Sequence, residues 1–464
     1  MNRPSRSIVP ALALTLSACA VGPDYETPET APASFINASQ PGFTTASVEA
    51  AWWRQFGDPV LEDLVTRSLD GNPDLRIAEA RIAQARAVFD EGKLDLFPAV
   101  TTHAGFSRQD SPVPQSGALT PVSYDVYDVG FDAAWELDVF GRVRRSVEAA
   151  RADAEAAEAD YQFSQVSLTA EVAREYFALR GAQRRLVVAR NNLENQREVL
   201  RLTRVRLELG VGQEIDVASA RARLAETESL LPPLVVAEKR SAHRLAVLIG
   251  LRPGALDAEL VPVSVATRVE EVPIGDPADL LRRRPDVRAA ERQLAAHTAR
   301  VGVATADLFP RLSVTGFIGF VSGSSSSLGD SGTEAWFVTP RLDWAAFDLG
   351  SARARLRASE AGSEAALAAY EQTVLLALEE TENAFVAYAE EQKRLAALVE
   401  QVSASRRAAE LARIQYEEGA VDFLRLLDAE STVLDAEDAV TAAETSLNTN
   451  VVAIYKALGG GWNL

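Results

Sequence analysis

Two long stretches of the chain place apolar and small residues at the three-, four- and seven-residue steps of packed helices. They cover residues 142–209 and 351–418, contain no proline, and hold one internal glycine each, Gly181 and Gly362. At 1.5 Å per residue each predicted helix is about 100 Å long. The pattern therefore predicts two unusually long helices.

A glycine-containing turn follows each stretch and leads into a further helix. The turns are Gly210-Val211-Gly212 and Glu418-Gly419-Ala420, and the last helix is expected to continue to Lys456. Each long helix is thus half of a helical hairpin. A free-standing coiled coil explains these seams but not the strands described next.

Two shorter helices are predicted at residues 74–94 and 286–306, which are rich in Ala, Arg and Leu. Each is followed by the same four residues, Asp95-Leu96-Phe97-Pro98 and Asp307-Leu308-Phe309-Pro310. Because the residue before proline avoids the α region, these DLFP motifs should end the helices and begin strands.

Strand patterns follow both DLFP motifs. Residues 99–106 are rich in β-formers, and residues 127–138 alternate apolar side chains with acidic or small ones. Residues 109–117 between them predict a loop by composition. In the second half a strand at 312–320, a loop at 323–330 and a return strand at 336–344 repeat this hairpin.

The chain also repeats itself at the level of sequence. Residues 72–76 match 284–288 at an offset of about 212, the DLFP motifs match at the same offset, and the match resumes at about 209 in the long helices. The resumed pairs include Trp135 with Trp344, Glu171 with Glu380, and Gly210 with Gly419. We interpret this as a tandem duplication, so each half is a complete structural unit.

The first residues carry a basic end and a short apolar run, residues 8–16, typical of a secretory signal. Leu16-Ser17-Ala18-Cys19 resembles the bacterial lipobox, which implies cleavage before Cys19 and a covalent lipid on its thiol. Ala20 after the cysteine implies sorting to the outer membrane. Beyond the signal, no apolar run approaches the roughly 20 residues of a transmembrane helix.

Composition excludes several functions. The formal net charge of −19 is spread along the chain, which disfavours nucleic acid as a partner. Three histidines and one cysteine provide no metal-ligand or disulfide spacing, so no metal site and no cofactor other than the lipid on Cys19 are expected. No acid/base motif is recognisable, and we do not expect an enzyme.

Three motifs in order resemble the NodT-type lipoproteins of the TolC outer-membrane efflux family: residues 19–25 (CAVGPDY), residues 56–59 (FGDP) after Trp53, and residues 135–142 (WELDVFGR). The resemblance covers essentially the whole mature chain. It implies an α+β membrane protein, a homotrimer in which each chain gives four strands to one twelve-stranded transmembrane β-barrel. A long periplasmic α-helical barrel would continue it.

The implied function is the outer-membrane channel of a tripartite efflux pump, a passive duct that exports small molecules from the periplasm or cytoplasm. The implied partners are a periplasmic adaptor protein, an inner-membrane transporter of the resistance-nodulation-division (RND) class and outer-membrane lipid. A type I secretion exit duct and a non-channel lipoprotein that tethers the envelope are the alternatives. The transported substrates are not specified by any residue.

The expected organisation has five parts: a signal peptide at 1–18, a lipidated segment at 19–57, a first efflux repeat at 58–257, a linker in an equatorial belt at 258–276, and a second efflux repeat at 277–464.

Two sets of candidate site residues follow. On the predicted strand, one side should face a polar lumen and the other lipid, with Asp128, Asp132 and Glu136 on the first side and Val129, Phe131 and Trp135 on the second. The carboxylates favour cations, although they could simply be solvated.

The second set lies at the tip of the second hairpin, where the resemblance implies a closed gate of Tyr416, Leu424 and Asp428. Leu424 and Asp428 are one helical turn apart and share a face. Relatives can carry an Arg near position 431, where this chain has Ser431, so Asp428 needs another cation or a hydroxyl partner. Alternatively, Leu424 packs in the helix seam and Asp428 is favoured by the helix dipole.

Overall fold

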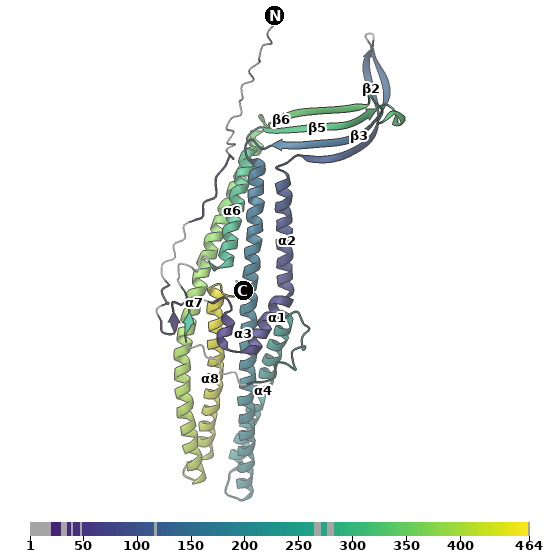
Figure 1. The fold of residues 1–464 in the computed structure, drawn as a ribbon. Helices are drawn as coiled ribbons and strands as arrows, with labels where there is room; N and C mark the ends of the chain where they lie inside the picture. Colours follow the sequence, from purple (N-terminus) through teal and green to yellow (C-terminus); the bar gives the residue numbers. More distant parts are fainter. Residues whose placement is uncertain are drawn as a thin grey trace. The chain divides into compact units, whose positions relative to one another are not determined.

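A computed structural model describes residues 20–28, 35–38, 40–46, 49–115, 118–263, 271–275 and 283–462. The chain divides into two compact units (Figure 1). The first unit holds the described residues up to Pro28 together with Arg81–Glu158 and Ala289–Glu371. The second holds the described residues of Glu29–Ala80, Ala159–Arg288 and Gln372–Leu464.

The first unit contains one antiparallel sheet in the order β2-β3-β5-β6. Its register places Thr102, Phe131, Ile318 and Trp336 in one row across the four strands. β2 and β6 are the two edges. The strand bounds are β2 Ala99–Gln115, β3 Ala118–Leu137, β5 Arg311–Ser322 and β6 Glu334–Asp343.

The predicted loop at 109–117 is wrong over most of its length. β2 continues to Gln115 and β3 starts at Ala118, with Pro112 opposite Pro121. β3 pairs with β5 only from Tyr127 onwards, so the outer part of this hairpin is a two-stranded ribbon with free edges. Proline is tolerated at such an edge, because its missing N–H removes no ladder bond there.

The two shorter helices are confirmed as α2 (Pro73–Leu94) and α6 (Pro285–Ala306). Both start at a proline, which fits a first helical turn because its N–H would have no partner in any case. Each ends directly before a DLFP motif, and the following strand starts directly after it. The predicted helix-to-strand junctions are therefore confirmed.

Both junctions are tied to their return strands by the same bond. The indole Nε1–H of Trp135 donates to the Leu96 carbonyl at 3.1 Å, and that of Trp344 donates to the Leu308 carbonyl at 3.1 Å. The two tryptophans occupy matching positions of the two halves. The same hydrogen bond thus closes the base of each strand hairpin.

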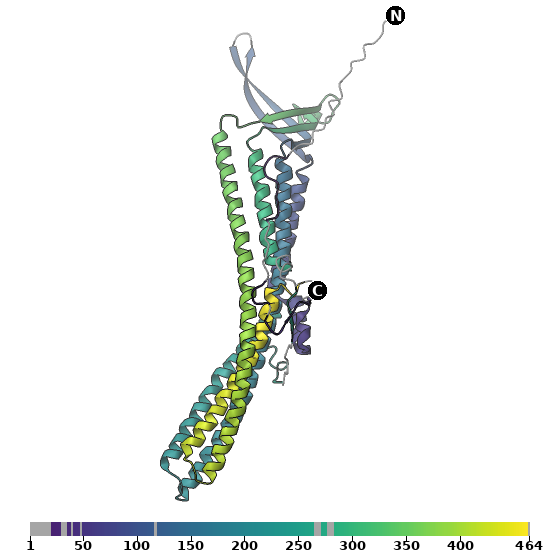
Figure 2. The same ribbon diagram turned by 90° about the vertical axis from the view of Figure 1, so that its left-hand side faces the viewer.

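The long helices are confirmed as α3 (Arg142–Glu208) and α7 (Leu349–Glu417). They turn into α4 (Glu214–Leu248) and α8 (Phe423–Ala457). Gly210 and Gly419 in the turns have φ of 76° and 74°, a region that side chains other than glycine rarely adopt. In the second unit the two hairpins lie side by side, with α4 against α8 (Figure 2).

The core of the second unit surrounds η1 (Trp52–Phe56) and α1 (Pro59–Gly71). Trp52 is fully buried and stacks on Tyr455 with ring centroids 5.1 Å apart. Asp58 caps α1 by accepting from the Val60 N–H, and it also accepts the Tyr176 hydroxyl at 2.5 Å. Short strands β1 (Phe43–Thr44) and β4 (Val272–Pro273) pair in parallel beside it.

The two halves make equivalent contacts in this core through different side chains. Asn72, before α2, donates from Nδ2 to the Leu248 carbonyl at 2.8 Å. Arg284, before α6, donates from its guanidinium to the Ala457 carbonyl at 2.9 Å. Each contact joins the start of a shorter helix to the end of a hairpin, at positions that match between the halves.

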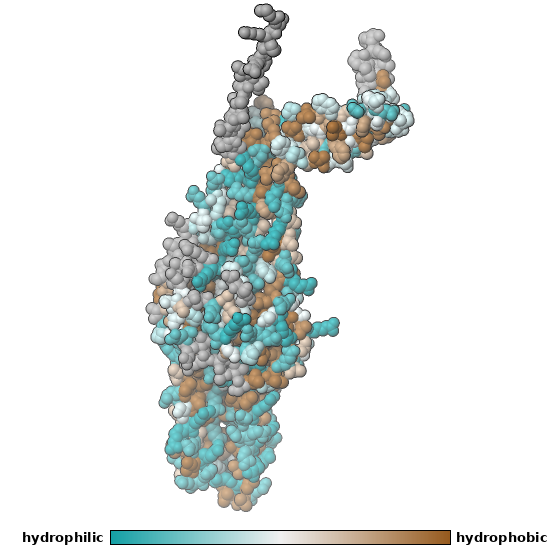
Figure 3. Space-filling view, in the orientation of Figure 1, coloured by the Kyte–Doolittle hydropathy of each residue, from teal (hydrophilic) through white to brown (hydrophobic). Residues whose placement is uncertain are grey.

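The residues on the surface differ in hydropathy between the strands and the helices. Apolar side chains are prominent over the strands in Figure 3, whereas the visible sides of the long helices are mainly hydrophilic. In the described part of the chain, no helix has both the length and the apolar character needed to cross a membrane. Of the expected linker at 258–276, residues 264–270 and 276 lie outside the described residues.

Candidate functional site

The acidic side chains of β3 lie on one side of the sheet, as their even spacing predicts. Asp128 pairs in register with Gly105 and Val321, and Asp132 pairs with Thr101 and Phe317. Both carboxylates are partly exposed. The structure therefore brings Asp128 and Asp132 to one side, separated by the row of Gly130.

Sequence reasoning missed His103, which occupies the β2 position opposite Gly130. Its Nδ1 lies 3.0 Å from an Asp128 carboxylate oxygen and 3.9 Å from an Asp132 oxygen. The shorter contact is an ion pair when the imidazole carries its second proton. Only the register between strands could have identified this neighbour, because His103 is 25 residues away from Asp128 in sequence.

Glu136 lies on the same side but differs in its partners. The guanidinium of Arg142, the first residue of α3, donates two hydrogen bonds to its carboxylate, at 2.6 and 2.8 Å. Such bidentate pairing compensates the charge and fixes the orientation of both groups. Glu136 therefore joins strand to helix, and its carboxylate contributes less to the local negative potential than those of Asp128 and Asp132.

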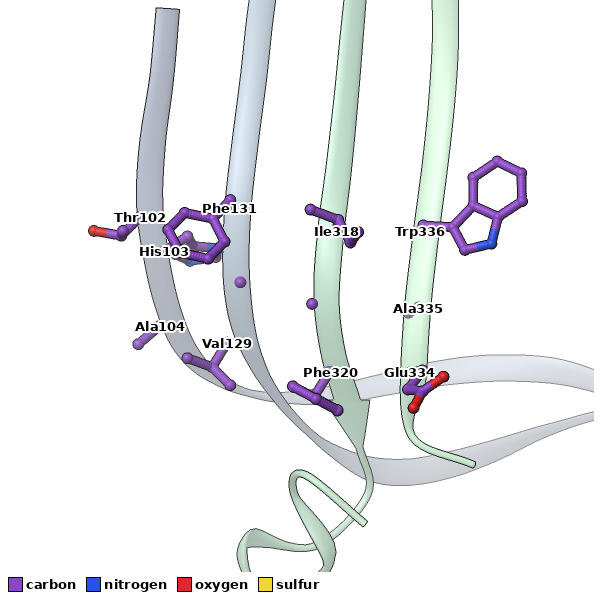
Figure 4. Close-up of a pocket in the computed structure, with 12 residues that line it drawn as sticks. Thr102, His103, Ala104, Val129, Phe131, Ile318, Phe320, Glu334, Ala335 and Trp336 are labelled. Carbon is purple, nitrogen blue, oxygen red and sulfur yellow. The ribbon is translucent and has the colours of Figure 1, made fainter. Parts of the chain in front are cut away.

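The opposite side of the sheet is apolar and largely exposed. Val129, Phe131 and Trp135 have exposed side chains, as the alternation predicted. A groove of about 810 Å³ on the sheet is lined largely by apolar residues, among them Phe131, Ile318 and Trp336 (Figure 4). The sheet thus has one side with acidic groups and one broad apolar side.

At the tip of the second hairpin, Tyr416 is packed between the hairpins. Its ring lies 5.7 Å from that of Phe423, and the Arg206 guanidinium of α3 lies over it at 4.7 Å. Burial raises the pKa of its hydroxyl, although the Arg206 charge opposes this. Tyr416 belongs with the buried cluster of Leu200 and Leu427.

Leu424 and Asp428 lie apart from that cluster, on an exposed face of α8. The Leu424 side chain is 49% exposed, so it is not part of the helix seam. Asp422, not Asp428, caps the helix by accepting the Arg425 N–H. The exposure of Leu424 argues against seam packing within this chain, and the role of Asp428 stays a prediction.

Asp428 has no ion-pair partner within the described ranges of this chain. The Thr432 hydroxyl donates to the Asp428 backbone carbonyl at 3.0 Å. A salt bridge that sequence reasoning missed lies close by. Arg413 of α7 contacts Glu430 of α8 at 2.7 Å, and the Glu430 side chain is only 10% exposed. This bridge joins the two helices of the second hairpin just beyond its tip.

Cys19, the predicted lipidation position, lies outside the described residues, which begin at Ala20. Within the described residues, no group of three or more His, Cys, Asp or Glu side chains is arranged to hold a metal ion. The candidate site therefore consists of the acidic side of β3 and the exposed face of α8 at Leu424 and Asp428.

Comparisons with known sequences agree with this architecture. The chain matches the family model described as Outer membrane efflux protein over residues 64–251 and 277–460. It is 32% identical over 460 residues to the probable efflux pump outer membrane protein TtgC of Pseudomonas putida, covering 97% of this chain and 94% of the relative. It is 31% identical over 466 residues to nodulation protein T of Rhizobium leguminosarum bv. trifolii, covering 99% and 98%.

Solved structures give the same result. The outer-membrane channel OprN superposes with a TM-score of 0.93 at 52% identity, over 96% of this chain and 100% of that one. The open state of the Neisseria gonorrhoeae MtrE outer membrane channel superposes with a TM-score of 0.84 at 31% identity, over 96% and 99%. The sequence and structural matches both cover nearly the whole chain, and this protein belongs to the outer membrane efflux protein family.

Proposed function

We propose that three copies of this outer-membrane efflux protein form one passive duct, with a twelve-stranded barrel to which each chain gives four strands. The observation that carries the proposal is the open sheet of the first unit, in which β2 and β6 are unpaired edges. The smallest closed barrels have about eight strands, so four cannot close alone. Pairing β2 of one copy with β6 of the next joins the four-stranded parts of the sheets into a closed ring.

We also propose that the chain is a tandem duplication with the organisation expected from its sequence, from the signal peptide at 1–18 to a second repeat at 277–464. The paired bonds of Trp135 and Trp344 support it, as do the matching contacts of Asn72 and Arg284. Duplication supplies two strand hairpins and two helical hairpins per chain. Three chains would therefore arrange six similar helical hairpins around one axis.

The acidic side of the sheet is proposed to face the lumen and the apolar side the lipid. Asp128 and Asp132 would then form rings of carboxylates in the trimer, which raise the local cation concentration. Glu136, held by Arg142, contributes less. The groove around Phe131 and Trp336 would be covered by acyl chains.

The periplasmic end is proposed to be gated by Leu424 and Asp428. Both side chains lie on an exposed face of α8 in the single chain, so three copies can bring them together around an axis. Apolar Leu424 side chains would close the pore, and Asp428 would find its partner on a neighbouring chain. Tyr416, packed under Arg206, would hold the tip in shape rather than block the pore.

The proposed partners are a periplasmic adaptor and an inner-membrane RND transporter. Support comes from two relatives in Pseudomonas. TtgC is named a probable efflux pump outer membrane protein, and OprJ is named an outer membrane protein. Cys19 is proposed to carry a lipid that anchors the chain to the outer membrane. No cofactor besides this lipid and no enzymatic activity are proposed.

Single-channel recording in a planar bilayer tests the duct. The purified full-length protein should give stepwise currents that favour cations, and Asp128→Asn with Asp132→Asn should reduce that preference. Glu136→Gln is the matched control on the same side of the strand and should change it less. A protein that inserts but passes no current would contradict the duct and favour the tethering lipoprotein.

A further inference from the structure

The acidic side of the sheet also carries one pair of aromatic side chains. Asp132 of β3, Phe317 of β5 and Phe337 of β6 are opposite one another in one row, so all three side chains point to the same side. The two rings stack with centroids 6.0 Å apart and an interplanar angle of 23°, and Phe337 is 50% exposed. A side that only needs to be polar does not require this aromatic surface.

Two glycines make room for the Phe317 ring on the strands. Gly130 and Gly319 are opposite one another in the neighbouring row. A Cβ built on Gly130 would lie 2.6 Å from the Phe317 Cε2, and one built on Gly319 would lie 2.8 Å from the Phe317 Cζ. A larger residue at either position would displace the ring. The backbone of β3 and β5 therefore supports the ring in a defined place, where it remains partly exposed.

Two carboxylates flank the row that receives this ring. Asp132 is directly opposite Phe317, and Asp128 lies on the other side of the Gly130 row. The Asp128 Oδ2 atom is shielded from solvent and accepts no hydrogen bond from any described residue. Its contact with His103 at 3.0 Å is an ion pair only when the imidazole is charged. A shielded carboxylate oxygen that lacks a donor favours a cation from outside the chain.

The rows that hold these residues contain no lysine or arginine to neutralise the carboxylates. In the described strands the rows are Thr101–Asp132–Phe317–Phe337, His103–Gly130–Gly319–Ala335 and Gly105–Asp128–Val321. Neighbouring strands are about 4.8 Å apart, so the acids on β3 and the outer ring on β6 are separated by about 10 Å. A ligand that contacts both must therefore have the size of several fused rings, which is larger than a metal ion.

We propose that Phe317, Phe337, Asp128 and Asp132, here called the lumenal subsite, bind planar aromatic cations on their way through the duct. The face of an aromatic ring attracts a cation, stacked rings accept a flat ligand, and the two carboxylates complement its charge. Each subsite binds weakly, because a duct conducts only if the cargo can leave again. The proposal rests on the proposed duct, with the acidic side of the sheet facing the lumen.

Ethidium, a planar aromatic cation, tests the subsite in the purified full-length protein at about pH 8, where an ordinary histidine is uncharged. In single-channel recording we expect ethidium to reduce the current in steps, and in a separate titration its fluorescence should increase on binding. Tetrapropylammonium is a cation without a ring, and naphthalenesulfonate is a ring system with the opposite charge. Each should need an at least about tenfold higher concentration for the same reduction of current.

Substitutions separate the rings from the carboxylates. Phe317→Leu with Phe337→Leu keeps apolar side chains but removes both rings, and should weaken ethidium binding about tenfold while leaving the effect of tetrapropylammonium unchanged. Asp128→Asn with Asp132→Asn should weaken the binding of both cations. Trp336→Leu is the matched control, because Trp336 precedes Phe337 on β6 and its 76% exposed side chain lies on the opposite side. It should leave ethidium binding unchanged.

A single variant guards against misfolding of the double one. Phe337→Leu changes a half-exposed side chain on an edge strand and should weaken ethidium binding about threefold.

Three results would overturn the subsite. They are equal effects of ethidium and tetrapropylammonium, which would mean that the rings contribute nothing, equal effects of ethidium and naphthalenesulfonate, which would mean that the rings only narrow the lumen, and unchanged ethidium binding in Phe337→Leu. Failure of the duct is a separate result. A protein that inserts but passes no current contradicts the duct, while the fluorescence titration still decides whether the subsite exists.

Discussion

The two helical hairpins of the second unit have the same plan but different packing. α4 and α8 are both 35 residues long, and both follow a glycine turn. Yet α4 contains Pro232 and Pro233 in its interior, whereas α8 contains no proline. The buried side chains of α8 are also more numerous, 13 against 8 in α4.

This difference indicates that the two hairpins have different tasks. An interior proline removes a helical hydrogen bond and clashes with the preceding turn, so it persists only where packing does not demand a straight helix. Around it, Leu230, Val235 and Val236 of α4 are exposed. We infer that the first hairpin tolerates distortion, while the second, which holds the proposed gate residues Leu424 and Asp428, is packed more firmly.

The largest effect on stability should come from adding an interior proline to α8 or removing one from α4. Ala442 of α8 occupies the position that matches Pro233 of α4. Ala442→Pro should lower the free energy of unfolding by about 3 kcal/mol or more, whereas Pro233→Ala should leave it the same or raise it. Circular dichroism on heating measures both. Similar melting temperatures for the two variants would remove the contrast between the hairpins.

The next effect concerns the salt bridges between the helices of each hairpin. Arg413→Ala leaves the buried Glu430 carboxylate without its partner and should cost about 2 kcal/mol. Arg197 and Glu228 in the first hairpin are both half-exposed and 3.6 Å apart, so Arg197→Ala should cost less than about 1 kcal/mol.

A double variant checks the cause. Adding Glu430→Gln to Arg413→Ala should recover part of the lost stability, because the second change removes the unpaired buried charge. No recovery would mean that Arg413 acts through packing and not through its charge.

The proposed gate allows the two hairpins to be compared by channel conductance. Leu424→Ala with Asp428→Ala should raise resting conductance roughly tenfold, the change expected if about 1.4 kcal/mol is lost from the closed state. Ile215→Ala with Ser219→Ala alters the matching positions of the first hairpin and is the control. Equal leak from both double variants, each shown to reach the outer membrane, would place the gate elsewhere.

The smallest effect is a pH dependence at Glu380, which matches Glu171 of the first half. Burial would raise the Glu380 pKa, but hydrogen bonds and charge from Lys456 and Arg284 outweigh it and lower the pKa below the ordinary 4.5. A lowered folded-state pKa contributes stability above the unfolded value, and this is lost as pH falls through the folded pKa.

Glu380→Gln should therefore reduce stability at neutral pH by at most about 1 kcal/mol, because the side chain is 39% exposed and screened. It should also make the loss below about pH 4 less steep. Glu171→Gln is the control. If Glu380→Gln loses stability below about pH 4 as steeply as the parent protein, then the contacts of Arg284 and Lys456 with this carboxylate do not contribute to stability.

Local sequence patterns predicted the helices and junctions well, because each depends on neighbours along the chain. The DLFP prolines end α2 and α6 where the steric rule requires, and the alternation from Tyr127 to Leu137 forms β3. The duplication pattern also led to matched positions such as Trp135 and Trp344, which make the same bond.

Features that depend on other strands or helices were not predictable. The continuation of β2 through Pro112 depends on its edge position. Pro232 lies inside α4, although proline usually breaks a helix. His103 beside Asp128 requires the strand register, and the Arg413–Glu430 bridge requires the hairpin packing. In each case a contact distant in sequence decides the outcome.

The central claim is that the sheet β2-β3-β5-β6, open at both edges, closes only with the sheets of two other copies. Native mass spectrometry of the full-length protein, extracted from membranes in mild detergent, tests this directly. The account predicts a mass of three chains with their lipids. A protein that is folded by circular dichroism but has the mass of a single chain would contradict it.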